Sequence, residues 1–488
     1  MPITEKKIKP LQPLNPTEEK LLAMVDEHSQ DLTSLLQDLV KIDSVNVSED
    51  VYAERNEIFR FTEEYLRKQG FKTELVKVPF PGGTSGQDYF NLIASIESKN
   101  PGRSLQFNGH LDTVAYNPKN WNKETLPLGG VVKDGRLYGR GAADMKSGIA
   151  SQIIAMRILK ESNLEFKGRL QLWCTPDEET HGKFGSEYMV KNRPDMVKTN
   201  ATIISEPRSQ PPLRAPVITL GEKGPHWLKF TFYGVAGHGS VPKQKSNALN
   251  KAARFIVNSQ RSFKIPDRKL PVNTFTLLRT FLERYTLPDL VKLMSRKVAN
   301  PNPLEKDKRK IGMAFKTTYS FDRIQAGQKV NIVPDLCVLD VDFRVLPGLS
   351  TQKLFDAIAD YCSKLGYKVD LPEGYQNKQQ VSGKFALEPV DIRVSVITIG
   401  EGFLIDKDTQ FGKVLAQAFE AVYQTKPVYT FSSGFSDGGN MLSGGMTDVF
   451  IIGPEGYHPH NANEYVMIDS VVMAAKLYLL TAYRYLNS

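Results

Sequence analysis

The sequence predicts an α/β fold in which a domain with a mixed sheet is interrupted by an inserted α+β domain. Short apolar runs typical of buried strands alternate with stretches of helical spacing, which is the pattern of a sheet with helices on both faces. Between about residues 215 and 371 the pattern changes to strands with alternating apolar and polar residues, as in 227–233 and 338–343. The chain has 488 residues, more than one typical domain holds, so two domains are expected.

The order of the elements sets the expected domain boundaries. Buried strands are expected at 104–108, 170–174, 202–204 and 449–452. Helices are expected at 17–40, 51–69, 411–423 and 469–486, and within the insertion at 246–259 and 350–365. The first domain is therefore expected in two parts, residues 1–214 and 372–488, around an inserted domain at 215–371. Residues 261–316 are long for a simple loop and carry a helical pattern, so they are expected to form a sub-insertion.

Composition and charge argue against several classes of protein. No apolar run approaches the ~20 residues that cross a bilayer, so a soluble protein without a membrane span is expected. Residues 1–16 lack the apolar segment of a secretory signal, which favours a cytoplasmic protein. The net charge of +9 comes from basic residues interleaved with acidic ones, which favours a solvated surface over nucleic-acid binding. The three cysteines are odd in number and far apart, so any metal is expected to be held by nitrogen and oxygen atoms.

Histidines and acidic residues follow the expected strands at the points where the strands end. In open α/β sheets, ligands bind beyond the carboxyl ends of the strands. The candidate residues are His110 and Asp112 after 104–108, Glu178 and Glu179 after 170–174, Glu206 after 202–204, and His458 and His460 after 449–452.

His110 and a further candidate, Asp144, can each be explained without a metal. His110 and Asp112 are two residues apart, so the carboxylate can orient the imidazole as a metal ligand, but a structural histidine has the same pattern. Asp144 precedes an apolar helix and either bridges two cations or caps that helix. A dinucleotide-binding loop is not expected there, because Asp144 occupies the third glycine position and would repel a pyrophosphate.

The remaining candidates are acids in loops and a pair of histidines. Glu178 and Glu179 are adjacent, so one can bind metal while the other accepts a proton from metal-bound water; a solvated acidic turn is the alternative. Glu206 is either a ligand of a second metal or a surface acid, and His458 competes with His460 for the last position. Carboxylates and imidazoles without thiolates suit zinc, and also cobalt or manganese.

Five motifs occur in a specific order along most of the chain. They are 110–112 (His-Leu-Asp), 139–146 (Gly-Arg-Gly-Ala-Ala-Asp-Met-Lys), 177–179 (Asp-Glu-Glu), 205–207 (Ser-Glu-Pro) and 460–464 (His-Asn-Ala-Asn-Glu). Together they resemble the motifs of the di-zinc hydrolase family that includes aminoacylases, acetylornithine deacetylases, succinyl-diaminopimelate desuccinylases and carboxypeptidases. This resemblance implies a metallopeptidase-like catalytic domain with an inserted lid domain of the dimerisation type.

The resemblance also implies a role for each residue of the motifs. His110, Asp144 and Glu206 would hold one zinc ion, and Asp144, Glu179 and His460 the other, with Asp144 as the bridge. Glu178 would be the general base and Asp112 the orienting acid. His460 is preferred over His458 because the family pattern places the ligand four residues before a glutamate, here Glu464.

Motifs in the insertion resemble those of the family's lid. The segments 237–240, 331–334 and 342–344 imply that His238 polarises the scissile carbonyl and that Arg344 and Asn331 hold the substrate's carboxylate. The segment 434–437, with Gly434 and Ser436, resembles a further substrate-side loop.

The activity that the resemblance implies is removal of the acyl group from an N-acyl amino acid by metal-activated water. Cleavage of short peptides by a dipeptidase or carboxypeptidase is the close alternative, and a ligand-binding homologue without catalysis is the remote one. A homodimer formed through the lid domain is the implied assembly. Residues 261–316 depart from the family's usual pattern and resemble the carboxypeptidase S group.

Overall fold

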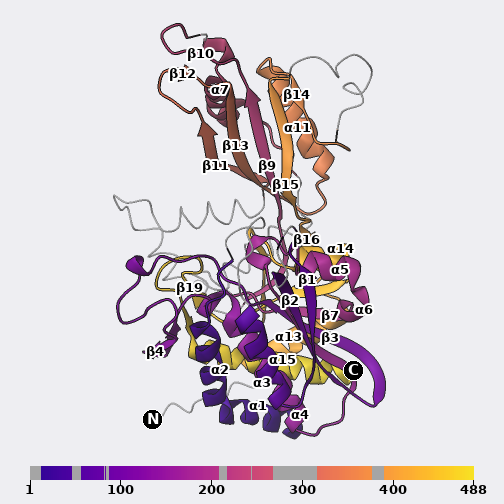
Figure 1. Cartoon of the computed structure of the whole chain (residues 1–488). Coiled ribbons are helices and arrows are strands. Elements are labelled where there is room, and N and C mark those ends of the chain that lie inside the picture. Colours follow the sequence, from indigo (N-terminus) through magenta and orange to yellow (C-terminus); the bar gives the residue numbers. More distant parts are fainter. Residues whose placement is uncertain are drawn as a thin grey trace, which may run out of the picture. The chain divides into compact units, whose positions relative to one another are not determined.

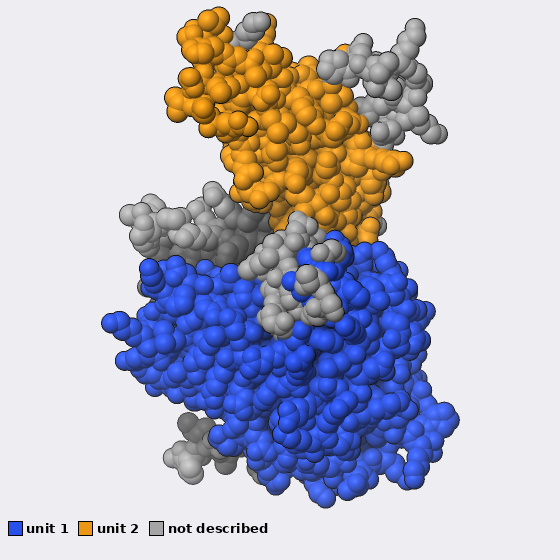
Figure 2. Space-filling view, in the orientation of Figure 1, with its two compact units in different colours: residues 1–221, 404–431, 436–488 blue, residues 222–403, 432–435 orange. Residues whose placement is uncertain are grey.

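The computed structural model describes residues 13–46, 56–81, 83, 87–207, 217–242, 244–267, 316–375 and 390–488. The chain forms two compact units, each with its own main sheet (Figures 1 and 2). Unit 1 comprises residues 1–221, 404–431 and 436–488, and unit 2 comprises residues 222–403 and 432–435.

Unit 1 is built on a nine-stranded mixed sheet. Its strands lie in the order β1, β2, β6, β3, β7, β18, β8 and β16, and β17 pairs with β8. Their bounds are β1 (Lys72–Pro79), β2 (Asp88–Glu97), β3 (Asn100–His110), β6 (Lys167–Thr175), β7 (Ala201–Ile204), β8 (Val217–Glu222), β16 (Phe403–Leu404), β17 (Val428–Ser432) and β18 (Asp448–Ile451).

The four central strands of this sheet, β6, β3, β7 and β18, run parallel to one another. Their C-terminal parts are buried on both faces, as parallel strands covered by helices usually are. Because parallel strands end at the same edge of a sheet, the residues that follow β3, β6 and β7 are brought to one place.

Helices cover both faces of the nine-stranded sheet. Phe107 contacts Tyr478 of α15 on one face, with ring centroids 5.6 Å apart. Its neighbour Gln106 points to the other face and bonds Gln171, whose amide donates to the Met196 carbonyl of α6 over 3.1 Å. The helices of this unit are α1 (Pro16–Glu27), α2 (Ser29–Lys41), α3 (Asn56–Lys68), α4 (Ser147–Glu161), α5 (Ser186–Asn192), α6 (Pro194–Val197), α13 (Gln410–Tyr423), α14 (Gly438–Ser443) and α15 (Ile468–Leu486).

The helix expected at 17–40 is two helices, so this prediction was wrong about one break. α1 begins with a capping box in which Asn15 and Glu18 each accept a backbone N–H of the other over 3.0 Å. His28, with φ −91° and ψ 9°, ends α1 and precedes α2. Val25 and Leu32 are buried on either side of His28, so the apolar spacing continues across the break and conceals it.

A small second sheet in unit 1 joins two segments that are far apart in the sequence. It has the order β19 (Gly456–Tyr457), β20 (Tyr465–Met467), β5 (Arg136–Tyr138) and β4 (Val131–Lys133). The pairing of β20 with β5 brings the loop 458–464 beside the glycine-rich segment 139–146.

In its described residues, unit 2 contains a five-stranded sheet with two helices on one face. Phe230 and Phe232 of β9, Leu339 of β13 and Phe355 of α11 share its buried core, and the alternating burial of β9 and β13 leaves the other face partly exposed. The sheet has the order β11 (Thr318–Ala326), β13 (Leu336–Val345), β9 (Gly224–Tyr233), β15 (Ile392–Ile399) and β14 (Val369–Asp370); the helices are α7 (Ala248–Ser262) and α11 (Thr351–Lys364); β10 (Gly237–His238) pairs with β12 (Ile332–Val333).

The second unit continues past residue 371, where the sequence placed the end of the insertion. β15 pairs with β9, and its residues Ile392 and Val394 lie in the same core, so this part of the chain belongs to unit 2. Residues 268–315, most of the expected sub-insertion, lie outside the described part of the chain. Among the described helices, none has the length and apolar character needed to cross a bilayer.

Candidate metal centre

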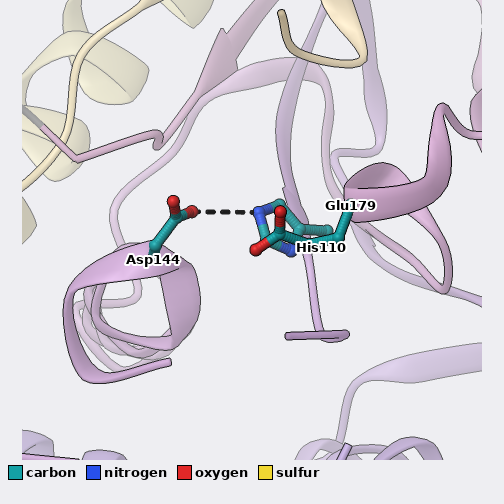
Figure 3. Close-up of side chains that lie close together, drawn as sticks. All are labelled: His110, Asp144 and Glu179. Atoms are coloured by element: carbon teal, nitrogen blue, oxygen red, sulfur yellow. Dashed lines mark hydrogen bonds and ion pairs between the residues drawn. The ribbon is translucent and has the colours of Figure 1, made fainter. Parts of the chain in front are cut away.

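His110 is the last residue of β3, and its two ring nitrogens have different surroundings. Nδ1 lies 3.0 Å from the backbone carbonyl of Asp112, which accepts a hydrogen bond from Nδ1–H. The neutral ring then keeps its proton on Nδ1 and leaves the Nε2 lone pair available to a metal. Nε2 lies 3.2 Å from Asp144 Oδ1 and 3.5 Å from Glu206 Oε1. Figure 3 shows the contact between the His110 ring and Asp144.

Asp144 lies in an irregular helical turn, η2 (Ala142–Lys146), directly before α4. Gly141 at the start of this turn has φ 79°, a left-handed conformation that favours glycine. The two carboxylate oxygens of Asp144 face different histidines: Oδ1 lies 3.2 Å from His110 Nε2, and Oδ2 lies 3.3 Å from His460 Nε2. A carboxylate in this position can bridge two cations, and its side chain makes no cap for α4.

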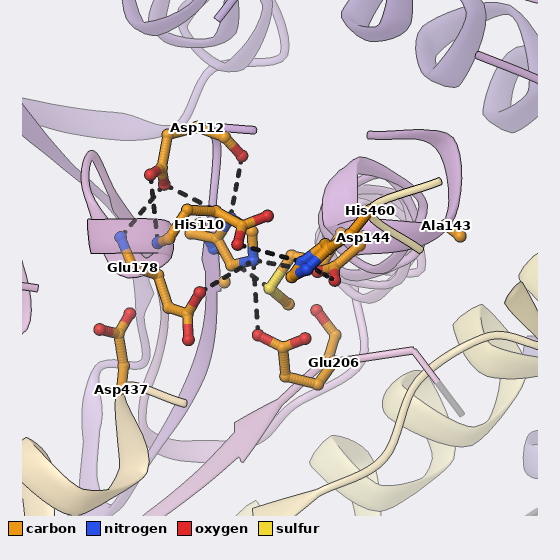
Figure 4. Close-up of polar contacts among 12 residues, drawn as sticks. His110, Asp112, Ala143, Asp144, Glu178, Glu206, Asp437 and His460 are labelled. Atoms are coloured by element: carbon orange, nitrogen blue, oxygen red, sulfur yellow. Dashed lines mark hydrogen bonds and ion pairs between the residues drawn. The ribbon is translucent and has the colours of Figure 1, made fainter. Parts of the chain in front are cut away.

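Glu178 and Glu179 lie in a tight turn, η3 (Glu178–Thr180), that follows β6. The Asp112 carboxylate accepts the backbone N–H of Glu178 over 3.2 Å and that of Glu179 over 3.3 Å, so it fixes both residues as well as lying beside the His110 ring (Figure 4). Glu178 Oε2 lies 3.7 Å from His110 Nε2, and Glu179 Oε2 lies 3.1 Å from His460 Nε2.

Asn46 is a buried residue of the site that the sequence did not reveal. Its side-chain amide donates to Asp112 Oδ2 over 3.1 Å and to Thr180 Oγ1 over 2.7 Å. No strand or motif surrounds Asn46 in the sequence, and its partners are far away along the chain. Only the tertiary structure identifies it.

Glu206 stands two residues beyond the end of β7, and the chain after β7 passes close to the start of α4. A Cβ atom on Gly148, in the first turn of α4, would lie 2.4 Å from the Ser205 backbone oxygen. Glycine at 148 therefore permits the approach that brings the start of α4 beside Glu206.

His460 and His458 both have positive φ, 63° and 58°, but they face different neighbours. His460 reaches Asp144 and Glu179, whereas the His458 ring packs edge-on against Tyr465 at 5.9 Å. The geometry therefore favours His460 as the second histidine of the centre.

The centre concentrates negative charge in a buried volume. Burial, together with the neighbouring carboxylates, raises the pKa of Glu178, Glu179 and Glu206, and the pKa of Glu206 reaches about 7. Hydrogen bonds with Asp144 and Glu179 raise the pKa of His460 to about 10. Burial also opposes ionisation of Asp144, but hydrogen bonds from His110 and His460 outweigh it and lower the pKa.

The donor set fits divalent metal ions. Two groups, His110 with Asp144 and Glu179, and His110 with Glu178 and Glu206, each place one ligand atom per residue within 4.8 Å of one another. Nitrogen and oxygen donors without sulfur suit zinc, cobalt or manganese, and divalent cations would neutralise the carboxylates that repel one another here. Neither group contains His460, which lies 3.3 Å from Asp144 and 3.1 Å from Glu179, and the second group contains Glu178, expected as the base. The five residues expected as ligands nevertheless lie close together.

The expected residues of the insertion lie in unit 2. His238 on β10 is exposed, and its Nδ1 accepts the Ser240 backbone N–H over 3.3 Å, which leaves the proton of a neutral ring on Nε2. Arg344 on β13 is partly buried, and its Nε donates to Asp342 Oδ2 over 3.0 Å. Asn331 is exposed beside β12.

The loop after β17 holds the two remaining candidates. The Gly434 backbone N–H donates to Ser432 Oγ over 2.9 Å. Ser436 is buried, and its Oγ accepts the Gly438 N–H over 3.2 Å, at the start of α14. Asp437, next along the chain, accepts from Thr175 over 2.7 Å and is labelled beside Glu178 in Figure 4.

Comparisons with known proteins identify a family. The profile of the family described as "Peptidase family M20/M25/M40" matches residues 106–484. The chain is 24% identical over 451 residues to an uncharacterized metallohydrolase of Methanococcus maripaludis, a match that covers 91% of this chain and 97% of that protein.

Two further relatives have names that state an activity. The chain is 32% identical over 234 residues to a succinyl-diaminopimelate desuccinylase of Rickettsia africae, covering 48% of this chain and 58% of that enzyme. It is 29% identical over 325 residues to an acetylornithine deacetylase of Proteus mirabilis, covering 66% of this chain and 69% of that enzyme.

Among solved structures, human carnosine dipeptidase 1 has the same fold. It matches with a TM-score of 0.68 at 17% sequence identity, and the match covers 96% of this chain and 99% of that one. The predicted α/β fold with its inserted domain is thereby confirmed.

Proposed function

Because this chain belongs to peptidase family M20/M25/M40, we propose that it removes the acyl group from an N-acyl amino acid at a two-zinc centre. Membership makes the chain a metal-dependent hydrolase of amide or peptide bonds, as the motifs indicated. The relatives named as deacylases, at 29% and 32% identity, support an acyl-amino acid as the substrate.

The observation that carries the proposal is the position of the Asp144 carboxylate between His110 and His460, with Glu178 beside it. Asp144 would be shared by the two metal ions, His110 and Glu206 would complete the ligands of one, and Glu179 and His460 those of the other. Zinc ions bound there supply Lewis-acid chemistry, since they lower the pKa of a water molecule towards neutrality and polarise the amide carbonyl.

The protein's own residues move the proton and hold the charge that develops. Glu178 accepts the proton of the attacking water at its carboxylate and delivers it to the nitrogen of the leaving amine. Asp112 holds the backbone of Glu178 and orients His110. His238 donates from Nε2 to the carbonyl oxygen, which gains negative charge in the transition state.

Unit 2 acts as the lid and supplies the residues that recognise the amino-acid half of the substrate. Arg344 and Asn331 bind the carboxylate, and the Arg344–Asp342 ion pair orients the guanidinium for this contact. Gly434 and Ser436 form the substrate-side loop, and two copies of the chain associate through the lid.

A substrate panel tests the proposal. The protein is loaded with Zn²⁺ or Co²⁺, its metal content is measured, and hydrolysis is followed for acetyl-, succinyl- and long-chain acyl-amino acids and for dipeptides. Each acyl-amino acid is paired with its carboxamide, which lacks the carboxylate. We expect turnover of the acids but not of the carboxamides, and Arg344→Met should raise KM for the acids.

Two results would contradict the proposal in different ways. Faster hydrolysis of dipeptides than of every acyl-amino acid would assign the chain as a peptidase. Full metal loading without turnover on the whole panel would favour a binding protein that has kept the fold.

A further inference from the structure

A buried carboxylate joins the two segments that carry Asp144 and His460. Glu464 is 0% exposed and lies directly before β20. Its Oε1 accepts the backbone N–H of Ala143 over 2.9 Å and that of Asp144 over 3.0 Å. One carboxylate oxygen thus holds the turn from which the bridging aspartate projects.

The other oxygen of Glu464 is bound by Arg140, which is also buried. Arg140 Nη2 donates to the Asn461 carbonyl over 3.3 Å, next to His460 in the chain. The guanidinium lies 5.7 Å from the centre of the Trp121 ring, so its orientation is restricted. Arg140 therefore connects Glu464, which binds the Asp144 turn, with the loop that carries His460.

Close packing leaves these two segments little room to shift. A Cβ atom on Gly456 of β19 would lie 2.5 Å from the Ala143 side chain. The Gly139 backbone N–H also donates to the Glu464 carbonyl over 3.0 Å. Glu464 and Arg140 are not among the catalytic or metal-binding residues assigned above. A buried ion pair often adds little to the stability of a fold, so the presence of this pair beside the metal centre suggests a role in the centre itself.

We propose that Glu464 and Arg140 are positioning residues that set the distance between Asp144 and His460, and hence the affinity of the metal position these two share with Glu179. The inference rests on the two-metal centre of the proposed function. The other metal position shares Asp144, but its remaining ligands, His110 at the end of β3 and Glu206 after β7, make no contact with the pair. The effect should therefore be larger at the position that also contains His460. Partners of metal ligands typically contribute 10-fold to 100-fold in metal affinity.

The test measures the two zinc dissociation constants by competition with a chromophoric chelator. Glu464→Gln keeps an oxygen for the two N–H groups but replaces the charged oxygen with an amide that faces Arg140. We expect one dissociation constant to rise by about 10-fold to 100-fold while the other changes by less than about 3-fold. The absorption spectrum of bound Co²⁺ should change for that one ion.

A matched ion pair in the same unit serves as control. Glu18 of α1 binds Arg484 of α15 through two contacts of 2.7 and 3.0 Å, and the pair lies away from the ligands. Glu18→Gln should lower the melting temperature of the metal-free protein and leave both dissociation constants unchanged. If Glu464→Gln behaves in the same way, the pair is only structural and the inference is wrong.

Two further measurements keep the outcome decisive. Arg140→Lys retains a positive charge for Glu464 but loses the hydrogen bond from Nη2 to the Asn461 carbonyl. This variant should therefore weaken binding of the same zinc ion, and it serves as the test if Glu464→Gln fails to fold. An Arg140→Lys protein with wild-type zinc affinity at both positions would overturn the inference. Wild-type protein that binds fewer than two zinc ions would instead overturn the two-metal proposal itself.

Discussion

Glu178 and Glu179 are adjacent residues whose carboxyl groups face different partners. The Glu179 carboxylate lies 3.1 Å from His460. The Glu178 carboxylate lies 3.7 Å from His110, and Asp437 is another of its charged neighbours. Both backbones are held by the same Asp112 carboxylate. The pair therefore offers two matched substitutions with different expected consequences.

Glu178→Gln should lower kcat by about 10²-fold to 10⁴-fold and leave the metal content unchanged, because the amide cannot accept the proton of the attacking water. Glu179→Gln, the matched control, should lose metal instead. Steady-state kinetics and elemental analysis of both variants test this. Near-wild-type turnover by Glu178→Gln would show that another group is the base.

Asn46 offers a second prediction for a single residue. Its amide donates to Asp112 and Thr180, so Asn46→Ala leaves Asp112 less firmly held, and Asn46→Asp places a second carboxylate against it. We expect kcat to fall about 10-fold in Asn46→Ala and further in Asn46→Asp, with KM nearly unchanged in both. Equal losses in the two variants would argue against a role through Asp112.

At the scale of elements, the sequence predicted the features that arise from local patterns. The buried strands β3, β6 and β7 end at polar residues, so His110, Glu179 and Glu206 could be placed at one edge of a sheet from the sequence alone. Contacts without a local pattern could not be predicted. Asn46 meets Asp112 across 66 positions, and Arg140 meets Glu464 across 324.

The contact between β9 and α11 predicts how the stability of unit 2 depends on pH. His226 of β9 is buried against Thr351, the first residue of α11, with Nε2 2.9 Å from Oγ1. Burial lowers the pKa of His226 from 6.5 to about 4. The unfolded chain therefore binds a proton more readily than the folded unit does, so stability is complete above pH 6.5 and is lost as the pH falls towards 4.

The two pKa values correspond to roughly 3 kcal/mol of stability lost by pH 4. His226→Gln, which does not titrate, should lose less stability between pH 7 and 4 than the wild-type protein does. Thermal unfolding of the metal-free proteins across this range measures the difference. Parallel pH profiles for the two proteins would show that His226 is not responsible.

At the scale of the whole molecule, the candidate metal centre and the candidate lid residues belong to different units. All five proposed ligands lie in unit 1, whereas His238, Asn331 and Arg344 lie in unit 2, which has its own buried core. A ligand stabilises only the unit that must be folded to bind it. Metal binding and acid should therefore act on separate unfolding transitions.

Calorimetry tests this separation directly. Zinc at about 100 times its dissociation constant stabilises the folded centre by about 2.7 kcal/mol, which for a unit of this size shifts its melting temperature by roughly 4 °C. We expect a chelator to lower one of two transitions by this amount and to leave the other in place, while His226→Gln alters only the second. A single transition that moves as a whole would show that the two units unfold together, because separate cores would then not suffice for independent stability.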